Sequence, residues 1–195
     1  MEIVQRMDSR KIGNQLVLQC APLIVGLKMS NLFIIQNEHI SKMYRLLKES
    51  RISYYVFLVT EKMSTLFLYD REKLENFLSK KQTRLFFQEE GYLDFDLQKV
   101  LFRFRCQYRL YWSGKRDFPH ELGLLLGYPI EDVNGFILNK GKKSLYTGYW
   151  KVYDDVQGKK ELFRMYELAK ETLIQLVFNG ISIAEIIDTY NGATL

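Results

Sequence analysis

The chain has 195 residues, of which 47% are hydrophobic and 26% charged, and its net charge is +5. This composition excludes a largely disordered chain, and no apolar run approaches the ~20 residues that cross a bilayer. Met1 to Arg6 contain no long apolar segment, so we expect no secretory signal and a cytoplasmic protein. The two cysteines, Cys20 and Cys106, form no CxxC motif, so neither a disulfide framework nor a zinc signature is indicated.

Apolar periodicity predicts a series of short elements in the first half of the chain. The first thirty residues read as a helix or mixed segment that Pro22 interrupts. After it we expect a strand at 32–35, a helix begun by Asn37, strands at 52–60 and 65–69, and a helix begun by Asp70. Strand, helix, strand, strand, helix is the order that opens a split βαβ arrangement.

The second half is mainly helical. One stripe at helical spacing between Asp94 and Tyr111 predicts a helix with Leu97, Val100, Leu101, Phe104, Tyr108 and Tyr111 on its buried face. We then expect helices at 120–126 and 130–139, a strand at 146–153, helices at 159–178 and from Ser182, and fraying over 191–195.

Together these elements predict a single α+β domain over residues 1–195. We expect a mixed or antiparallel sheet of about four strands, with helices packed on it and a split-βαβ-like start. The strand at 146–153 would complete the sheet, and the helices of residues 94–140 would form an insertion.

Three segments are more specific than a generic core. They read C-x-P-x-x-x-G-x-K from Cys20 to Lys28, F-P-H-E-x-G-x-x-L-G-Y-P from Phe118 to Pro129, and G-Y-W-K-V-Y over 148–153. With these motifs the chain resembles, over nearly its whole length, a bacterial family defined as a domain of unknown function (DUF3793). At the position after Pro22, where a small polar residue is expected, this chain has leucine, so no hydroxyl role is indicated there. The resemblance implies no activity.

The first hypothesis for chemistry is a thiol site built from Cys20, His120 and Glu121. If Pro22 occupied the first turn of a helix, the helix dipole would stabilise a Cys20 thiolate, with His120 as base and Glu121 behind it. The alternative is that Cys20 is a buried apolar residue and that the Pro-His-Glu run only begins a helix. A metal site is less favoured, because no standard spacing links the candidate ligands Cys20, His39, Cys106, His120 and Glu121.

A second hypothesis is nucleic-acid binding by the basic helix, through Lys99, Arg103, Arg105 and Arg109. The alternative is an ordinary amphipathic helix with a solvated basic face, because the aromatic positions fall largely on the predicted buried stripe. No Walker-A or GxGxxG pattern occurs, so no nucleotide cofactor is indicated.

The remaining residues of the three motifs are candidates for a binding surface. They are Lys28, Tyr128, Asp132, Tyr149, Trp150 and Lys151. We expect Trp150 to need a partner for its indole N–H if it is buried. Because no complete catalytic signature is present, the sequence favours a non-catalytic binding or interaction protein. The alternative is a thiol-dependent enzyme or a redox- or metal-linked protein that uses Cys20 with His120 and Glu121. The sequence specifies neither cofactor nor partner.

Overall fold

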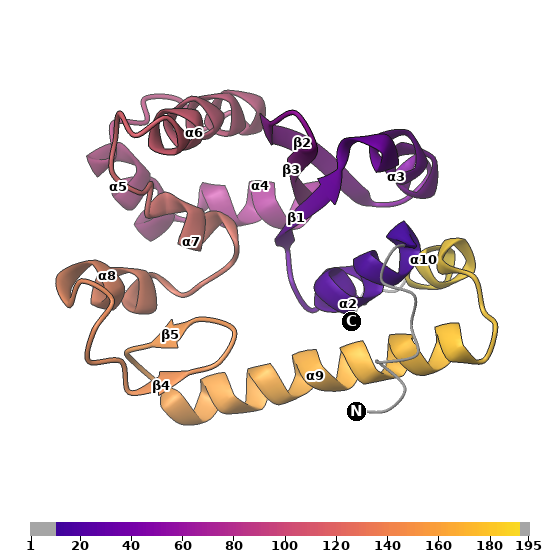
Figure 1. Ribbon diagram of the computed structural model, residues 1–195. Helices are drawn as coiled ribbons and strands as arrows, with labels where there is room; N and C mark the ends of the chain where they lie inside the picture. The colour runs from indigo at the N-terminus through magenta and orange to yellow at the C-terminus, as the bar shows by residue number, and fades with distance from the viewer. Residues whose placement is uncertain (1–10, 192–195) are drawn as a thin grey trace. The chain divides into compact units, whose positions relative to one another are not determined.

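The computed structural model describes residues 11–191 (Figure 1). The elements in chain order are α2 (Ile12–Ile24), β1 (Ser30–Gln36), η1 (Asn37–His39), α3 (Ile40–Leu47), β2 (Ile52–Val59), β3 (Met63–Asp70), α4 (Arg71–Ser79), α5 (Lys81–Glu89), α6 (Leu97–Trp112), α7 (Glu121–Leu125), α8 (Ile130–Leu138), β4 (Tyr146–Thr147), β5 (Lys151–Val152), α9 (Val156–Phe178) and α10 (Ile183–Asn191). The first six residues and most of the segment expected to fray lie outside this range. Among the helices between residues 11 and 191, none combines the length and the apolar character that a bilayer span requires.

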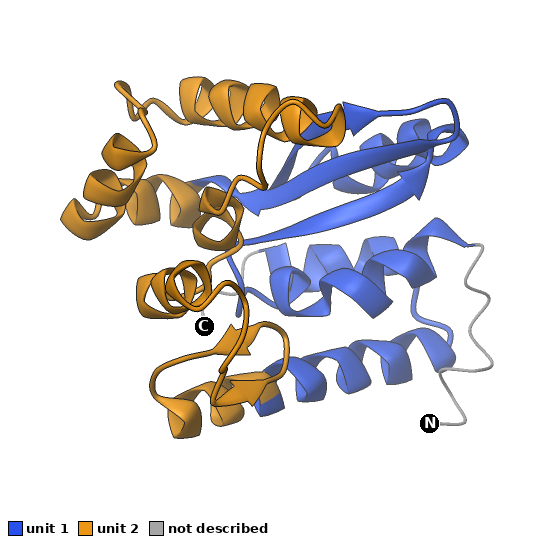
Figure 2. Cartoon of the chain, turned by 60° about the vertical axis from the view of Figure 1, so that its left-hand side comes forward, with its two compact units in different colours: residues 1–71, 164–195 blue, residues 72–163 orange. Residues whose placement is uncertain are grey.

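The α+β class is confirmed, and the chain divides into two compact units (Figure 2). The first unit comprises residues 1–71 and 164–195, and the second is the continuous segment 72–163. The second unit therefore interrupts the first in sequence. A single domain with an insertion at 94–140 stays a prediction.

The first unit is built on a three-stranded antiparallel sheet with the order β1-β3-β2. Both outer strands are antiparallel to β3, so β1 and β2 run in the same direction, with α3 between them in sequence. The predicted split βαβ start is thus confirmed. Phe33, Leu66 and Leu68 point into one core with residues of α2, α3, α10 and the C-terminal part of α9.

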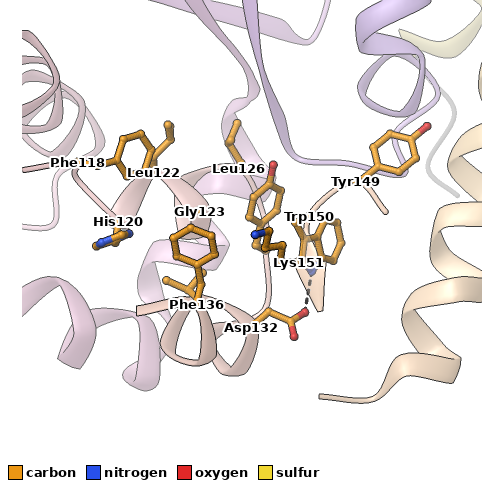
Figure 3. A pocket seen from close by; sticks show the side chains of 12 residues that line it. Phe118, His120, Leu122, Gly123, Leu126, Asp132, Phe136, Tyr149, Trp150 and Lys151 are labelled. Atoms are coloured by element: carbon orange, nitrogen blue, oxygen red, sulfur yellow. Dashed lines mark hydrogen bonds between the residues drawn. The ribbon is translucent and has the colours of Figure 1, made fainter. Parts of the chain in front are cut away.

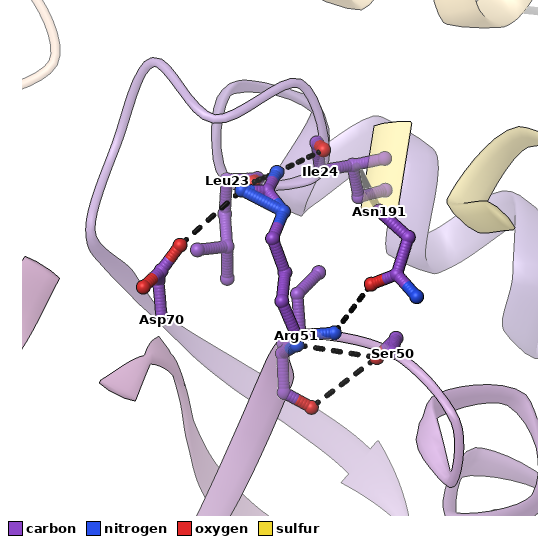
Figure 4. Close-up of polar contacts among 7 residues, drawn as sticks. Leu23, Ile24, Ser50, Arg51, Asp70 and Asn191 are labelled. Atoms are coloured by element: carbon purple, nitrogen blue, oxygen red, sulfur yellow. Dashed lines mark hydrogen bonds and ion pairs between the residues drawn. The ribbon is translucent and has the colours of Figure 1, made fainter. Parts of the chain in front are cut away.

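Helix α2 extends beyond the predicted interruption at Pro22, so that prediction is wrong. Proline removes one helical hydrogen bond, but only two residues of α2 follow it. The end of the helix is held from outside by Arg51, whose Nη2 donates to the carbonyls of Leu23 (3.2 Å) and Ile24 (2.6 Å) (Figure 4). Its Nη1 donates to Asp70 at 3.2 Å. One guanidinium therefore caps α2 and ties it to the end of β3.

The second unit is mainly helical, with a core of apolar and aromatic side chains from α4 to α8 that includes Phe87, Tyr92, Leu101, Phe104 and Leu125. The sequence did not predict α5, whose buried residues Thr83, Phe86 and Phe87 span only about one turn, directly after α4.

The strand expected at 146–153 is only partly present. Residues 146–147 and 151–152 form a two-stranded antiparallel ribbon, β4–β5, separate from the main sheet. The main sheet among residues 11–191 thus has three strands, and the prediction that the late strand completes it is wrong. Gly148 to Trp150 reverse the direction of the chain. The backbone N–H of Gly148 donates to the Trp150 carbonyl, and that of Leu145 donates to the Val152 carbonyl.

Candidate functional site

The carboxylate of Asp132 organises the segment that follows the ribbon turn. Asp132 lies in the first turn of α8 and is 2% exposed. Its Oδ2 accepts the indole N–H of Trp150 at 2.7 Å, and its Oδ1 accepts the backbone N–H groups of Tyr153 (2.7 Å) and Asp154 (3.2 Å). The expectation that a buried Trp150 needs an indole partner is confirmed. With three N–H donors on two oxygens, Asp132 serves to hold β5 against α8.

Two glycines allow the same segments to approach closely. A Cβ at Gly135 would lie 2.5 Å from Cβ of Tyr153, and one at Gly123 would lie 2.9 Å from Cγ2 of Val133. The Gly135 contact packs α8 against Tyr153, the residue that follows β5. The Gly123 contact packs α7 against α8, to which Val133 belongs.

These contacts leave a cavity of about 400 Å³ within the second unit (Figure 3). Residues of α7, α8 and β5, and of the segments that precede them, line it. The lining residues are Phe118, His120, Leu122, Gly123, Leu126, Tyr128, Asp132, Val133, Phe136, Tyr149, Trp150 and Lys151. The sequence-predicted candidates His120, Tyr128, Asp132, Tyr149, Trp150 and Lys151 are thus brought to one pocket, to which Phe118 and Phe136 add rings that sequence reasoning did not select.

The walls of the pocket are aromatic pairs. Tyr128 and Trp150 stack with their ring centroids 4.7 Å apart, and burial raises the pKa of the Tyr128 hydroxyl. The His120 ring lies between Phe118 and Phe136, at 5.6 Å and 5.7 Å from their centroids. No hydrogen bond joins the His120 imidazole to another residue between 11 and 191, and it forms no side-chain cap on α7. The imidazole is therefore available to a molecule in the pocket.

Glu121 does not line this pocket although it follows His120. It is 1% exposed, and its Oε1 accepts the hydroxyl hydrogen of Tyr92 at 3.0 Å. Its Oε2 is buried with no hydrogen-bond partner among the described residues. Burial raises the pKa of Glu121, and burial together with this carboxyl group raises the pKa of Tyr92. Glu121 thus faces the helical core and does not orient the His120 ring.

Cys20 lies in the C-terminal half of α2, not at a helix N-terminus, so the dipole argument for a thiolate is wrong. Its side chain is buried, and burial raises the pKa of the Cys20 thiol to about 12. Its partner is one that sequence reasoning missed: Nδ2 of Asn31 donates to Sγ at 3.3 Å. Oδ1 of Asn31 accepts from Nζ of Lys28 at 3.0 Å, and burial lowers the pKa of Lys28 to about 8.

The first family-like motif therefore forms a buried polar cluster in the first unit. Cys20 lies in the first unit and His120 and Glu121 in the second, so a pairing of Cys20 with His120 stays a prediction. Lys28 is 7% exposed and bonded to Asn31, so it is not a surface binding residue. Between residues 11 and 191 no group of three or more His, Cys, Asp or Glu side chains could hold a metal ion.

Helix α6 matches its predicted buried stripe at five of the six positions and departs from it at Tyr111. Phe104 and Tyr108 are buried, but Phe102, Tyr111 and Trp112 are exposed, so the prediction that Tyr111 belongs to the buried stripe is wrong. Of the four predicted phosphate ligands, Lys99 forms an ion pair with Asp94 (2.6 Å). Arg103 lies over the Tyr92 ring and donates to the Glu90 carbonyl. Arg109 is exposed and Arg105 half-buried.

A family model described as "Protein of unknown function (DUF3793)" matches residues 16–187. No curated protein and no solved structure gives a significant match to the chain.

Proposed function

Since the chain belongs to the DUF3793 family, whose description assigns no activity, we propose its function from the pocket of the second unit. The protein is a non-catalytic binding protein whose pocket takes a small, planar, largely apolar molecule. The observation that supports this is a cavity of about 400 Å³ walled by aromatic rings, a volume within the ~300–1,000 Å³ of ligand pockets.

The candidate catalytic carboxyl and thiol groups are bonded to other residues, directed away from the pocket or protonated, which favours binding over catalysis. Asp132 is the carboxylate that lines the cavity, and three N–H donors already occupy it. Glu121 faces away, and the Cys20 thiol stays protonated through neutral pH because burial raises its pKa to about 12. What faces the pocket is apolar surface, the His120 imidazole and the Lys151 ammonium.

The experiment titrates the protein with N-phenyl-1-naphthylamine, a neutral planar dye whose fluorescence rises in apolar surroundings. A Trp112→Phe background leaves Trp150 as the single indole, so its emission should transfer energy to the bound dye. We expect saturable binding, and Phe136→Ala should weaken it about tenfold, since loss of an aromatic wall costs ~1–2 kcal/mol. Ile137→Ala is the matched control, because Ile137 is the next residue of α8 and does not line the pocket. Absence of saturation, or equal affinity of Phe136→Ala, would overturn the proposal.

A second candidate function is binding of single-stranded nucleic acid by α6. Phe102 and Trp112 are 59% and 57% exposed, and with Arg105 and Arg109 they fall within an arc of about 80° at 3.6 residues per turn. Helix α6 contains no acidic residue, so exposed rings for stacking lie beside uncompensated cations.

Fluorescence anisotropy with a labelled 12-mer of thymidine at two salt concentrations tests this second function. Arg109→Gln and Trp112→Ala should each weaken binding, whereas Lys99→Gln should not, because Asp94 already neutralises Lys99. Salt-independent or undetectable binding rejects this candidate.

A further inference from the structure

One edge of the aromatic pocket is positively charged. Lys151 lines the cavity, and its ammonium lies 6.0 Å from the centroid of the Phe136 ring (Figure 3). It donates one hydrogen bond, to the carbonyl of Gly141. An ammonium group has three donors, so two remain for a ligand.

The Gly141 carbonyl belongs to a lysine-rich loop, residues 139–144, which follows α8. Gly141 packs against Phe136, since a Cβ there would lie 3.0 Å from Cζ of that ring. The Lys142 carbonyl accepts the hydroxyl hydrogen of Tyr153 at 3.1 Å. These contacts hold the loop beside the pocket wall. Two lysines of the loop have left-handed backbone conformations, with φ of 49° at Lys140 and 58° at Lys143.

The charge of this edge is not compensated nearby. Residues 139–151 contain four lysines and no acidic residue. None of Lys140, Lys142, Lys143 and Lys151 forms an ion pair within residues 11–191, and their side chains are exposed. The carboxylate of Asp132 also lines the pocket, but it is buried and accepts hydrogen bonds from Trp150 and two backbone N–H groups. A negative ligand group would therefore meet cations at one edge of a largely apolar cavity.

We propose that the ligand of this pocket is a small amphiphilic anion. Its planar apolar part lies among Phe118, Phe136 and Trp150, and its oxyanion (carboxylate, sulfonate or phosphate) binds Lys151 beside the lysine-rich loop. This inference rests on the proposed binding function and adds the charge of the ligand to it. The apolar walls supply contact area, and the cationic edge fixes the orientation of the ligand.

The test compares two dyes that differ by one sulfonate: 8-anilino-1-naphthalenesulfonate, which is anionic, and N-phenyl-1-naphthylamine, which is neutral. In Lys151→Met we expect the dissociation constant of the anionic dye to rise about tenfold, which corresponds to the loss of one charge-assisted contact, while that of the neutral dye changes less than about twofold. Lys151→Arg should restore affinity for the anion. Lys115→Met is the charge-matched control, because exposed Lys115 does not line the pocket.

A second variant leaves the Lys151 contact with Gly141 intact. Lys142→Gln combined with Lys143→Asn removes two loop charges, and asparagine tolerates the left-handed backbone at position 143. This double variant should weaken binding of the anionic dye by about threefold. Sodium chloride should weaken binding of the anionic dye and leave binding of the neutral dye unchanged. If Lys151→Met weakens binding of both dyes equally, or of neither, the inference about the charge of the ligand is overturned while the binding function stands. If neither dye binds wild-type protein saturably, the proposed function fails as well.

Discussion

The carboxylate of Asp132 accepts the indole N–H of Trp150 at 2.7 Å, a hydrogen bond between residues 18 positions apart. The same carboxylate accepts the backbone N–H groups of Tyr153 and Asp154. Helix α8 and the end of the β4–β5 ribbon are therefore joined through one side chain, and the pocket depends on that junction.

We expect Asp132→Asn to destabilise the protein by ~2–4 kcal/mol. Asparagine has the same shape but only one acceptor oxygen, so its NH₂ group would face either the indole N–H or a backbone N–H. Urea unfolding followed by circular dichroism measures the loss. Glu131→Gln is the control, because Glu131 is the exposed neighbour on the same turn and should change stability by less than ~0.5 kcal/mol. An unchanged midpoint for Asp132→Asn would show that the carboxylate does not hold the ribbon.

The buried carboxyl group of Glu121 predicts a pH-dependent stability. Its pKa in the folded protein is raised above the ordinary value of 4.5, chiefly by burial, so the folded state binds more protons than the unfolded state. Stability conferred by the protonated form is present below about pH 4.5 and is lost as pH rises through the raised pKa. Glu121→Gln removes this titration and keeps an acceptor for the Tyr92 hydroxyl.

We therefore expect Glu121→Gln to gain stability relative to wild type as pH rises from 4.5 to 8. Each unit by which the pKa is raised corresponds to ~1.4 kcal/mol. Urea midpoints at several pH values measure the difference. Glu131→Gln again serves as control, and its difference from wild type should stay constant with pH. A Glu121→Gln difference that is equally independent of pH would mean that Glu121 titrates alike in the folded and unfolded states.

Arg51 connects the end of α2 to the end of β3, and its loss should lower the stability of the protein. Arg51→Met removes the hydrogen bonds to the Leu23 and Ile24 carbonyls and the ion pair with Asp70. We expect a destabilisation of ~2–4 kcal/mol in urea unfolding. Arg51→Lys should recover only part of it, because an ammonium cannot span both carbonyls and the carboxylate as the planar guanidinium does. Arg45→Met, at an exposed position of α3, should be nearly neutral, and a similar loss there would contradict the capping role.

The two cysteines should differ sharply in reactivity. Cys106 is exposed, whereas Cys20 is buried with its pKa raised to about 12. In native protein between pH 6 and 8, a thiol probe such as dithiobisnitrobenzoate should label one cysteine rapidly. Cys106→Ser should abolish rapid labelling, and Cys20→Ala should leave it unchanged. Rapid labelling of Cys106→Ser at pH 6 would instead support the thiol-dependent alternative.

Sequence reasoning found the elements whose apolar pattern is long or whose boundaries are marked. Helix α6 was predicted from its long apolar stripe, and helix α8 was predicted nearly to its ends because Pro129 precedes it. It missed α5, whose stripe is short, and it read the ribbon around Gly148 as one strand. It also placed Tyr111 on a buried face, although periodicity alone cannot tell where a helix passes beyond its neighbours.

The sequence by itself determined the α+β class, the split βαβ start, the family and six of the residues that line the pocket. These depend on periodicity and on local motifs, which a linear chain displays directly. Only the tertiary structure decided what the candidate residues do. Cys20 became a buried neutral thiol beside Asn31, Asp132 became the partner of Trp150, and Glu121 turned away from His120. Burial and partners far apart in sequence fix the charge and availability of a side chain, and both arise only when the chain packs.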